Sequence, residues 1–130
     1  MLFNISRDCA KEGKSLSIAS DLIRGNTETI ILANLMVCDS YGYKINKAIG
    51  LKTGDVFELK EATLYTAFRR LEESGCIFSY WGNEQTGARR RYYSITEQGK
   101  KTFYRRREEW HEAKQIIDKL ISIEGDGQND

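Results

Sequence analysis

The spacing of apolar residues between positions 60 and 75 predicts an amphipathic helix. At about 100° per residue, four apolar residues fall on one stripe: Leu64, Ala67, Phe68 and Leu71. The opposite side is small, hydroxylated and cationic: Ala62, Thr63, Thr66, Arg69 and Arg70. Gly75 is typical of the left-handed residue that ends a helix. One side of this helix is therefore expected to face the core and the other to face a partner.

Two stretches rich in aromatic and β-branched residues follow, at positions 76–81 and 89–95. The turn-prone segment between them predicts a hairpin with its tip near residues 85–88. A helix followed by such a hairpin is the arrangement of winged-helix DNA-binding proteins, in which the helix enters the major groove and the hairpin reaches phosphates or the minor groove. The candidate DNA-binding residues are polar or cationic: Lys60, Thr63, Thr66, Arg69, Arg70, Arg89, Arg90 and Arg91. The alternative is that these charges form a solvated surface.

Two supporting helices are predicted upstream, after a turn of helix at 20–24. The first spans residues 26–37, has Asn26 or Thr27 as its N-cap, and is apolar nearly all round. The second spans residues 41–49 after a cap at Asp39 or Ser40, and supports the 60–75 helix in a helix-turn-helix. Residues 50–59 are interpreted as a loop in which positions 56–59 form a short strand beside the hairpin. Lys60 opposes the helix dipole, which favours either a nearby phosphate or simple solvation.

Thr96 is the predicted N-cap of a long last helix. Its heptad positions form a mainly apolar seam: Phe103, Arg106, Trp110, Ala113, Ile117 and Leu120, widened by Ile116 and Ile121. A seam of roughly five turns exceeds what a hairpin can bury, so we expect it to pair with its own copy in a two-fold dimer, together with the first helix. The alternative is that this helix folds back on residues 26–37 of its own chain.

The predicted fold class is mainly α with a small β-hairpin, namely a winged helix-turn-helix with N- and C-terminal dimerisation helices. Residues 1–19 are expected to be a flexible N-terminal extension and residues 20–95 the winged-helix domain. Residues 96–123 form the expected C-terminal dimerisation helix. The tail at 124–130 has no large apolar residue and is expected to be disordered.

The formal net charge of the 130 residues is only +1, so any attraction to nucleic acid must come from local clusters. Lysine and arginine gather between positions 89 and 107, and acidic residues dominate after them. The three cysteines, Cys9, Cys38 and Cys76, are widely spaced, and His111 is the single histidine. These residues favour neither a disulfide framework nor a metal site.

Catalysis is not expected, because the sequence has no glycine-rich nucleotide-binding motif and His111 lies among glutamates on a helix. No cofactor is expected either. The N-terminus does not have the apolar segment of a signal peptide, and the longest apolar stretch, at 30–38, is too short to span a bilayer. We therefore expect a cytoplasmic protein without a membrane partner.

Four short motifs, in order and at matching spacing, resemble the PadR family of transcriptional regulators over residues 20–122. They are Leu22-Ile23-Arg24-Gly25, Tyr41-Gly42-Tyr43-Lys44-Ile45, Ala62-Thr63-Leu64-Tyr65 with Arg70-Leu71-Glu72-Glu73-Ser74-Gly75, and Arg91-Tyr92-Tyr93-Ser94-Ile95-Thr96-Glu97-Gln98-Gly99. The chain departs from the family pattern at Thr66 and Arg89, where proline is common, and it contains no proline. The tip of the hairpin is therefore expected to be less rigid and more cationic than in relatives.

The resemblance implies a homodimeric winged-helix repressor of the short subfamily. A dimer that holds two recognition helices about 34 Å apart is expected to bind an inverted repeat in double-stranded DNA. The resemblance implies that Thr63, Tyr65, Thr66 and Arg69 or Arg70 contact DNA, while the position of Tyr65 in the helix places it at the margin of the core. It also implies that Trp110 lines a dimer-interface site for a small planar aromatic effector, together with the seam residues Phe103, Ala113 and Ile117. The alternatives are that Trp110 simply packs the seam, and that the winged helix is a protein-interaction module without specific DNA binding.

Overall fold

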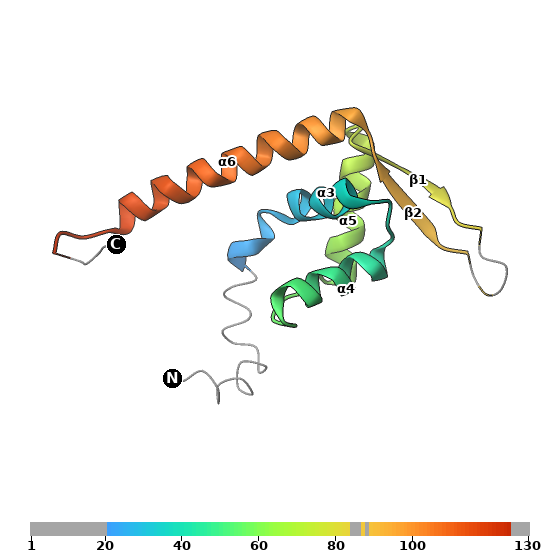
Figure 1. Ribbon diagram of the computed structural model, residues 1–130, viewed down its shortest axis with the longest axis horizontal. Helices are drawn as coiled ribbons and strands as arrows, with labels where there is room; N and C mark the ends of the chain where they lie inside the picture. The colour runs from blue at the N-terminus through green and yellow to red at the C-terminus, as the bar shows by residue number, and fades with distance from the viewer. Residues whose placement is uncertain (1–20, 84–86, 88, 126–130) are drawn as a thin grey trace.

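The structure is a computed structural model that describes residues 21–83, 87 and 89–125. After a helical turn at 21–24, the elements follow in the order α3 (Thr27–Val37), α4 (Gly42–Thr53), α5 (Glu61–Glu73), β1 (Ile77–Trp81), β2 (Arg91–Ile95) and α6 (Glu97–Ile121). In Figure 1 the shorter helices cluster beside the first half of α6, the hairpin projects from one end, and the second half of α6 extends from the other. The predicted winged-helix fold class is confirmed.

The core forms where α3, α4 and α5 meet the hairpin and the start of α6. All four residues of the predicted α5 stripe are buried, which confirms the helix and its inward side. The rings of Phe68 and Tyr93 stack with centroids 3.9 Å apart, so α5 packs directly on β2. Gly75 has φ of 79° and follows the end of α5 in the left-handed conformation that its sequence position predicted.

The two strands are antiparallel, with Ile77 opposite Ile95 and Trp81 opposite Arg91. The predicted hairpin is confirmed, whereas most of its predicted tip lies outside the described residues. The prediction of a third strand at 56–59 is wrong. Ser40 instead forms an isolated bridge to Tyr93, with N···O distances of 2.8 and 3.2 Å. The short connection between α3 and α4 therefore pairs with β2, and residues 56–59 do not add a strand to the hairpin.

Helix α4 does not end at residue 49 as predicted but continues to Thr53. A glycine inside a helix costs only about 1 kcal/mol, so Gly50 does not break it. Thr53 Oγ1 donates to the carbonyl of Ile49 at 2.9 Å in its last turn. Gly54, with φ of 62°, then supplies the left-handed residue at the end. The segment that leads into α5 is correspondingly shorter than the sequence suggested.

The predicted side-chain caps of α3 and α4 are not formed. Asn26 and Tyr41 occupy the N-cap positions, and neither side chain accepts a capping hydrogen bond. The Thr27 hydroxyl donates to Arg24 O at 2.8 Å instead, and the Asp39 carboxylate accepts from the Tyr80 hydroxyl at 2.6 Å. The Thr27 hydroxyl and the Asp39 carboxylate therefore form hydrogen bonds with other groups instead of capping a helix.

The prediction that Thr96 caps α6 is confirmed, because Thr96 Oγ1 accepts from the Gly99 amide at 3.0 Å. Phe103 is buried in the core, and Arg106 Nη1 lies 2.9 Å from Glu28 Oε1 on α3. The beginning of α6 thus packs on its own chain, as one of the two alternatives proposed. Further along, Trp110, Ala113 and the later seam residues are exposed or half-buried in this single chain.

No helix in the described part of the chain is both long enough and apolar enough to cross a membrane.

Candidate nucleic-acid interface

Six of the candidate residues lie on α5 or directly precede it: Lys60, Thr63, Tyr65, Thr66, Arg69 and Arg70. Thr63 and Thr66 are half-buried and the other four are exposed. Within the described ranges, none of these six side chains makes an ion pair or a hydrogen bond. Their polar groups are therefore available to a ligand that approaches the outer side of α5.

The two flanks of α5 differ in what they face. Thr63 and Arg70 line a hollow toward α3 and α6. On the other flank, the Tyr65 ring meets Phe68 edge-on with centroids 5.4 Å apart, and 45% of Tyr65 is exposed. A Cβ atom on Gly42 would lie 2.8 Å from the Tyr65 hydroxyl, so glycine permits this close approach of α4. The predicted place of Tyr65 at the margin of the core is confirmed.

The three consecutive arginines of the hairpin point to different partners. Arg91 Nη2 donates to Ser79 Oγ at 2.9 Å and lies 3.7 Å from Glu72 Oε1 on α5. Ser79 Oγ in turn donates to Glu72 Oε2 at 2.7 Å. Arg91 therefore fastens the hairpin to α5 while its side chain remains half exposed. Residue type and position did not reveal this inward role, because Glu72 and Ser79 become neighbours of Arg91 only in the folded hairpin.

Arg89 and Arg90 lie just before β2 rather than within it. Arg89 Nε donates to the carbonyl of Gly82 at 3.4 Å, and its guanidinium lies 5.7 Å from the Trp81 ring centroid. The guanidinium of Arg90 lies 4.8 Å from the ring of Tyr41, at the start of α4. Both arginines are exposed, so their charge is presented at the base of the hairpin loop.

A series of tyrosines that the sequence interpretation did not use joins the hairpin to the start of α4. Tyr80 and Tyr92 are stacked with centroids 5.6 Å apart, and Tyr92 meets Tyr41 edge-on at 5.2 Å. The hydrogen bond to the Asp39 carboxylate, with a smaller contribution from desolvation, raises the pKa of Tyr80 to about 12. The high aromatic content of both strands was the available signal for this cross-strand pair.

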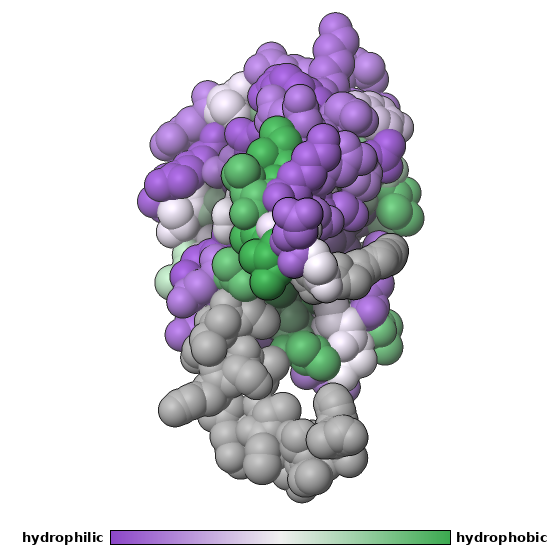
Figure 2. Space-filling view, turned by 90° about the vertical axis from the view of Figure 1, so that its left-hand side faces the viewer, coloured by the Kyte–Doolittle hydropathy of each residue, from purple (hydrophilic) through white to green (hydrophobic). Residues whose placement is uncertain are grey.

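The four candidate effector or dimer residues lie along α6 at different depths. Phe103 and Trp110 line one apolar cleft of about 600 Å³ against α3, with Arg107 at its edge. Ala113 is half-buried, and Ile117 is 49% exposed farther along the helix. Figure 2 looks onto this end of the molecule and shows a band of apolar surface between hydrophilic side chains. The structure thus joins Phe103 and Trp110 in one cleft but not Ile117.

Among the described residues, no group of three or more histidine, cysteine, aspartate or glutamate side chains could hold a metal ion. Cys38 is exposed and Cys76 is buried, and both are free thiols. The arrangement of polar and cationic groups on α5 and the hairpin suits recognition of an anionic polymer.

Comparisons with known proteins agree on one family. The family described as transcriptional regulator PadR-like matches residues 31–105. An uncharacterised protein of Lysinibacillus sphaericus is 44% identical over 101 residues, which cover 78% of this chain and 93% of the relative. A transcriptional regulator from Clostridium thermocellum is 48% identical with a TM-score of 0.72, covering 79% of this chain and 97% of that structure. A PadR family transcription regulator from Clostridium difficile is 35% identical with a TM-score of 0.63, covering 75% of this chain and 99% of that structure.

Proposed function

We propose that this chain, which belongs to the PadR-like family of transcriptional regulators, is a homodimeric repressor that binds an inverted-repeat operator. Regulators of this family are winged-helix DNA-binding proteins and not enzymes. The repressor activity, the dimer, the operator and an effector are the parts that we propose. Because the operator is chromosomal, the proposed place of action is the cytoplasm.

The observation that carries the proposal is the outer side of α5, where hydroxyl and guanidinium groups have no partner among the described residues. We propose that Thr66 and Arg69 read base edges in the major groove, with Tyr65 and Thr63 at the two flanks. Lys60 and Arg70 would contact phosphates beside the helix. Arg89 and Arg90 would hold the DNA backbone from the hairpin, and Arg91 would keep the hairpin at a fixed angle to α5.

The second half of α6 supports the proposed homodimer. Its large apolar residues are exposed in the single chain at helical spacing: Trp110, Ile116, Ile117, Leu120 and Ile121. Burying them against a two-fold copy would remove this surface from water at roughly 25 cal/mol per Å². Such a dimer would hold two α5 helices one turn of DNA apart, about 34 Å, so half-sites are expected roughly 10 bp apart.

The cleft between α3 and α6 supports the proposed effector site. Phe103 and Trp110 supply aromatic walls, and the partner's copy of Trp110 would lie near the dyad. A planar aromatic compound would stack on these rings. Its binding would change the angle between α6 and the rest of the chain, so the separation of the two α5 helices would no longer match the operator.

The test is a footprinting titration of the full chain on the promoter region of its own gene. Protection of an inverted repeat with half-sites roughly 10 bp apart is expected. A duplex containing that repeat should compete much better than a random duplex of equal length. Equal competition by both duplexes, or no protection at low salt, would contradict the proposal and favour the protein-interaction alternative.

A further inference from the structure

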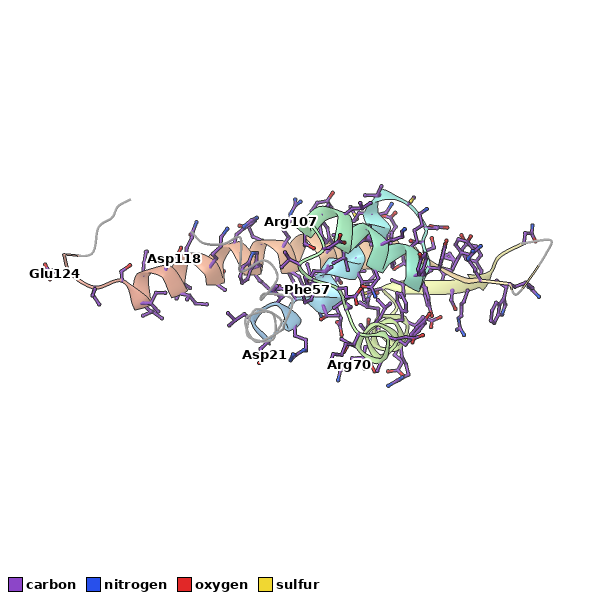
Figure 3. All side chains as sticks on the ribbon, turned by 90° about the horizontal axis from the view of Figure 1, so that it is seen from below. Asp21, Phe57, Arg70, Arg107, Asp118 and Glu124 are labelled. Carbon is purple, nitrogen blue, oxygen red and sulfur yellow. The ribbon has the colours of Figure 1, made fainter. Side chains whose placement is uncertain are left out.

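A hollow of about 540 Å³ lies beside α5, on the flank opposite Glu72. Three elements supply its polar lining, with Thr63, Thr66 and Arg70 from α5, Arg24 and Glu28 from the region where α3 begins, and Arg106 from α6. Figure 3 views α5 nearly end-on and shows Arg70 on the side of the molecule where Asp21 also lies. The hollow therefore lies where α5, the helix proposed to face DNA, meets the start of α3 and the first half of α6.

The charges in this lining are unbalanced, with three guanidinium groups against one carboxylate. The carboxylate of Glu28 is already paired with Arg106 at 2.9 Å, and Arg24 is paired with Asp21 outside the lining. Within residues 21–83, 87 and 89–125, the Arg70 guanidinium makes no ion pair or hydrogen bond. The hydroxyls of Thr63 and Thr66 are likewise without a hydrogen-bond partner in these ranges. Two of the three arginines are thus already paired with carboxylates, and the Arg70 guanidinium and the two threonine hydroxyls are left without an acceptor among the described residues.

We propose that this hollow binds the oxyanion of a phosphate group. The planar fork of Arg70 fits two phosphate oxygens, and the Thr63 hydroxyl can donate to a third. Thr27 and Glu28, in the first turn of α3, also line the hollow, and the partial positive charge of a helix start adds to the attraction. The volume exceeds that of one phosphate, so a phosphate ester also fits.

Two sources share this chemistry: a phosphodiester of bound DNA and a free phosphate-bearing small molecule. Either would contact Thr63 and Arg70 on the helix that is proposed to read the operator. A DNA phosphate would fix how deeply α5 enters the groove. A free ligand would occupy the same hollow, whose lining shares no residue with the Trp110 cleft.

The experiment is an isothermal titration of inorganic phosphate into the full chain without DNA, in chloride buffer of matched ionic strength. Saturable binding of one phosphate per chain is expected. Arg70→Gln should weaken it by about tenfold, the effect of losing one charge-assisted contact. The matched control is Arg105→Gln on α6, which is exposed, pairs with Glu109 and does not line the hollow; it should leave the affinity within about twofold.

Repeating the titration with the chain bound to its operator duplex distinguishes a DNA phosphate from a free ligand as the occupant of the hollow. Loss of phosphate uptake identifies the DNA backbone as the occupant, and unchanged uptake identifies a free ligand. The absence of saturable binding to the free chain overturns the proposal, as does equal affinity of wild type and Arg70→Gln with an unchanged thermal midpoint. Since the first titration contains no DNA, its failure would leave the proposed operator binding untouched.

Discussion

The side-chain amide of Asn46 on α4 brackets the backbone of Leu59, the residue before the N-cap of α5. Asn46 Nδ2 donates to Leu59 O at 2.8 Å, and Asn46 Oδ1 accepts from Leu59 N at 2.9 Å. Leu59 is itself buried in the core. The two hydrogen bonds satisfy both backbone polar groups of a residue that belongs to no helix or strand. The start of α5 is thereby fixed relative to α4.

Asn46→Ala should lower the free energy of unfolding by about 1–3 kcal/mol, because it leaves the N–H and C=O of Leu59 without partners. It should also weaken binding to the operator, since Lys60 and the first turn of α5 lose their anchor. Urea denaturation and a gel-shift titration measure the two effects. Lys44→Ala, an exposed change on the same helix, is the control and should stay within about 0.5 kcal/mol. A stable Asn46→Ala variant would show that packing of Leu59 alone positions α5.

Gly99 in the first turn of α6 is in contact with the segment between α5 and β1. A Cβ atom there would overlap the carbonyl oxygen of Cys76 and lie 2.7 Å from Ile95 Cγ1. Gly99→Ala should therefore destabilise the chain by about 1–3 kcal/mol or more, measured as a lower thermal midpoint. Gly25→Ala, where no atom lies within 4 Å, should have little effect. Similar midpoints for both variants would mean that α6 can shift away from Cys76 at little cost.

Local periodicity was sufficient to predict the elements that carry the candidate site. The α5 stripe, the stop at Gly75 and the cap at Thr96 depend on residues within one or two helical turns, and all three are confirmed. The types of residue that face outward from α5 followed from the same periodicity. The hairpin followed from aromatic and β-branched composition on both sides of a turn.

Features that depend on distant contacts could not be predicted in this way. The bridge between Ser40 and Tyr93, and the turn of Arg91 toward Glu72, join segments far apart in the chain. The Asp39 side chain was expected at a helix cap, but the hydroxyl of Tyr80 competes for it. Sequence patterns therefore gave the composition of the candidate interface more reliably than the direction in which each side chain points.

The stability of the chain should fall at alkaline pH through Tyr80. Its pKa of about 12 in the folded chain exceeds the ordinary 10.0, because the Asp39 carboxylate accepts the phenol hydrogen bond. The folded chain keeps this proton while the unfolded chain loses it, so the contribution is complete below pH 10.0 and is lost as the pH rises to about 12.

Denaturation curves of wild type, Tyr80→Phe and Asp39→Asn across this range measure that contribution. Wild type should lose stability more steeply with pH than either variant, and the two variants should behave alike. Parallel curves for all three would show that the hydrogen bond between Tyr80 and Asp39 does not persist in solution.

Ile117→Glu should convert the proposed dimer into monomers, because two carboxylates would face each other in an apolar seam. Sedimentation velocity measures the assembly state. Affinity for the full inverted repeat should fall toward that for a single half-site, since two linked half-sites bind with a large gain in effective concentration. Gln115→Glu introduces the same charge on the opposite side of α6 and should remain dimeric. A wild-type chain that is monomeric at micromolar concentration would contradict the proposal that the α6 seam forms a dimer.

Thr66 on α5 and Arg90 at the hairpin should have separable effects on DNA binding. Thr66→Ala removes a hydroxyl that is proposed to contact base edges, so it should change the order of preference among operator variants while keeping the salt dependence. Arg90→Ala removes a proposed phosphate contact, so it should weaken binding to all sequences alike and reduce the salt slope by about one. Binding to a set of single-base operator variants at several salt concentrations measures both.

Arg90→Lys keeps the charge near Tyr41 and should retain the salt slope of wild type, which separates loss of charge from loss of the ring contact. The opposite pattern, in which Arg90→Ala alters base preference and Thr66→Ala weakens all duplexes equally, would require the hairpin to enter a groove and α5 to lie along the backbone. Because Arg91 fastens the hairpin to α5 through Glu72, such a change would have to turn both elements together. The two mutations therefore test the docking orientation of the whole domain and not only the roles of two side chains.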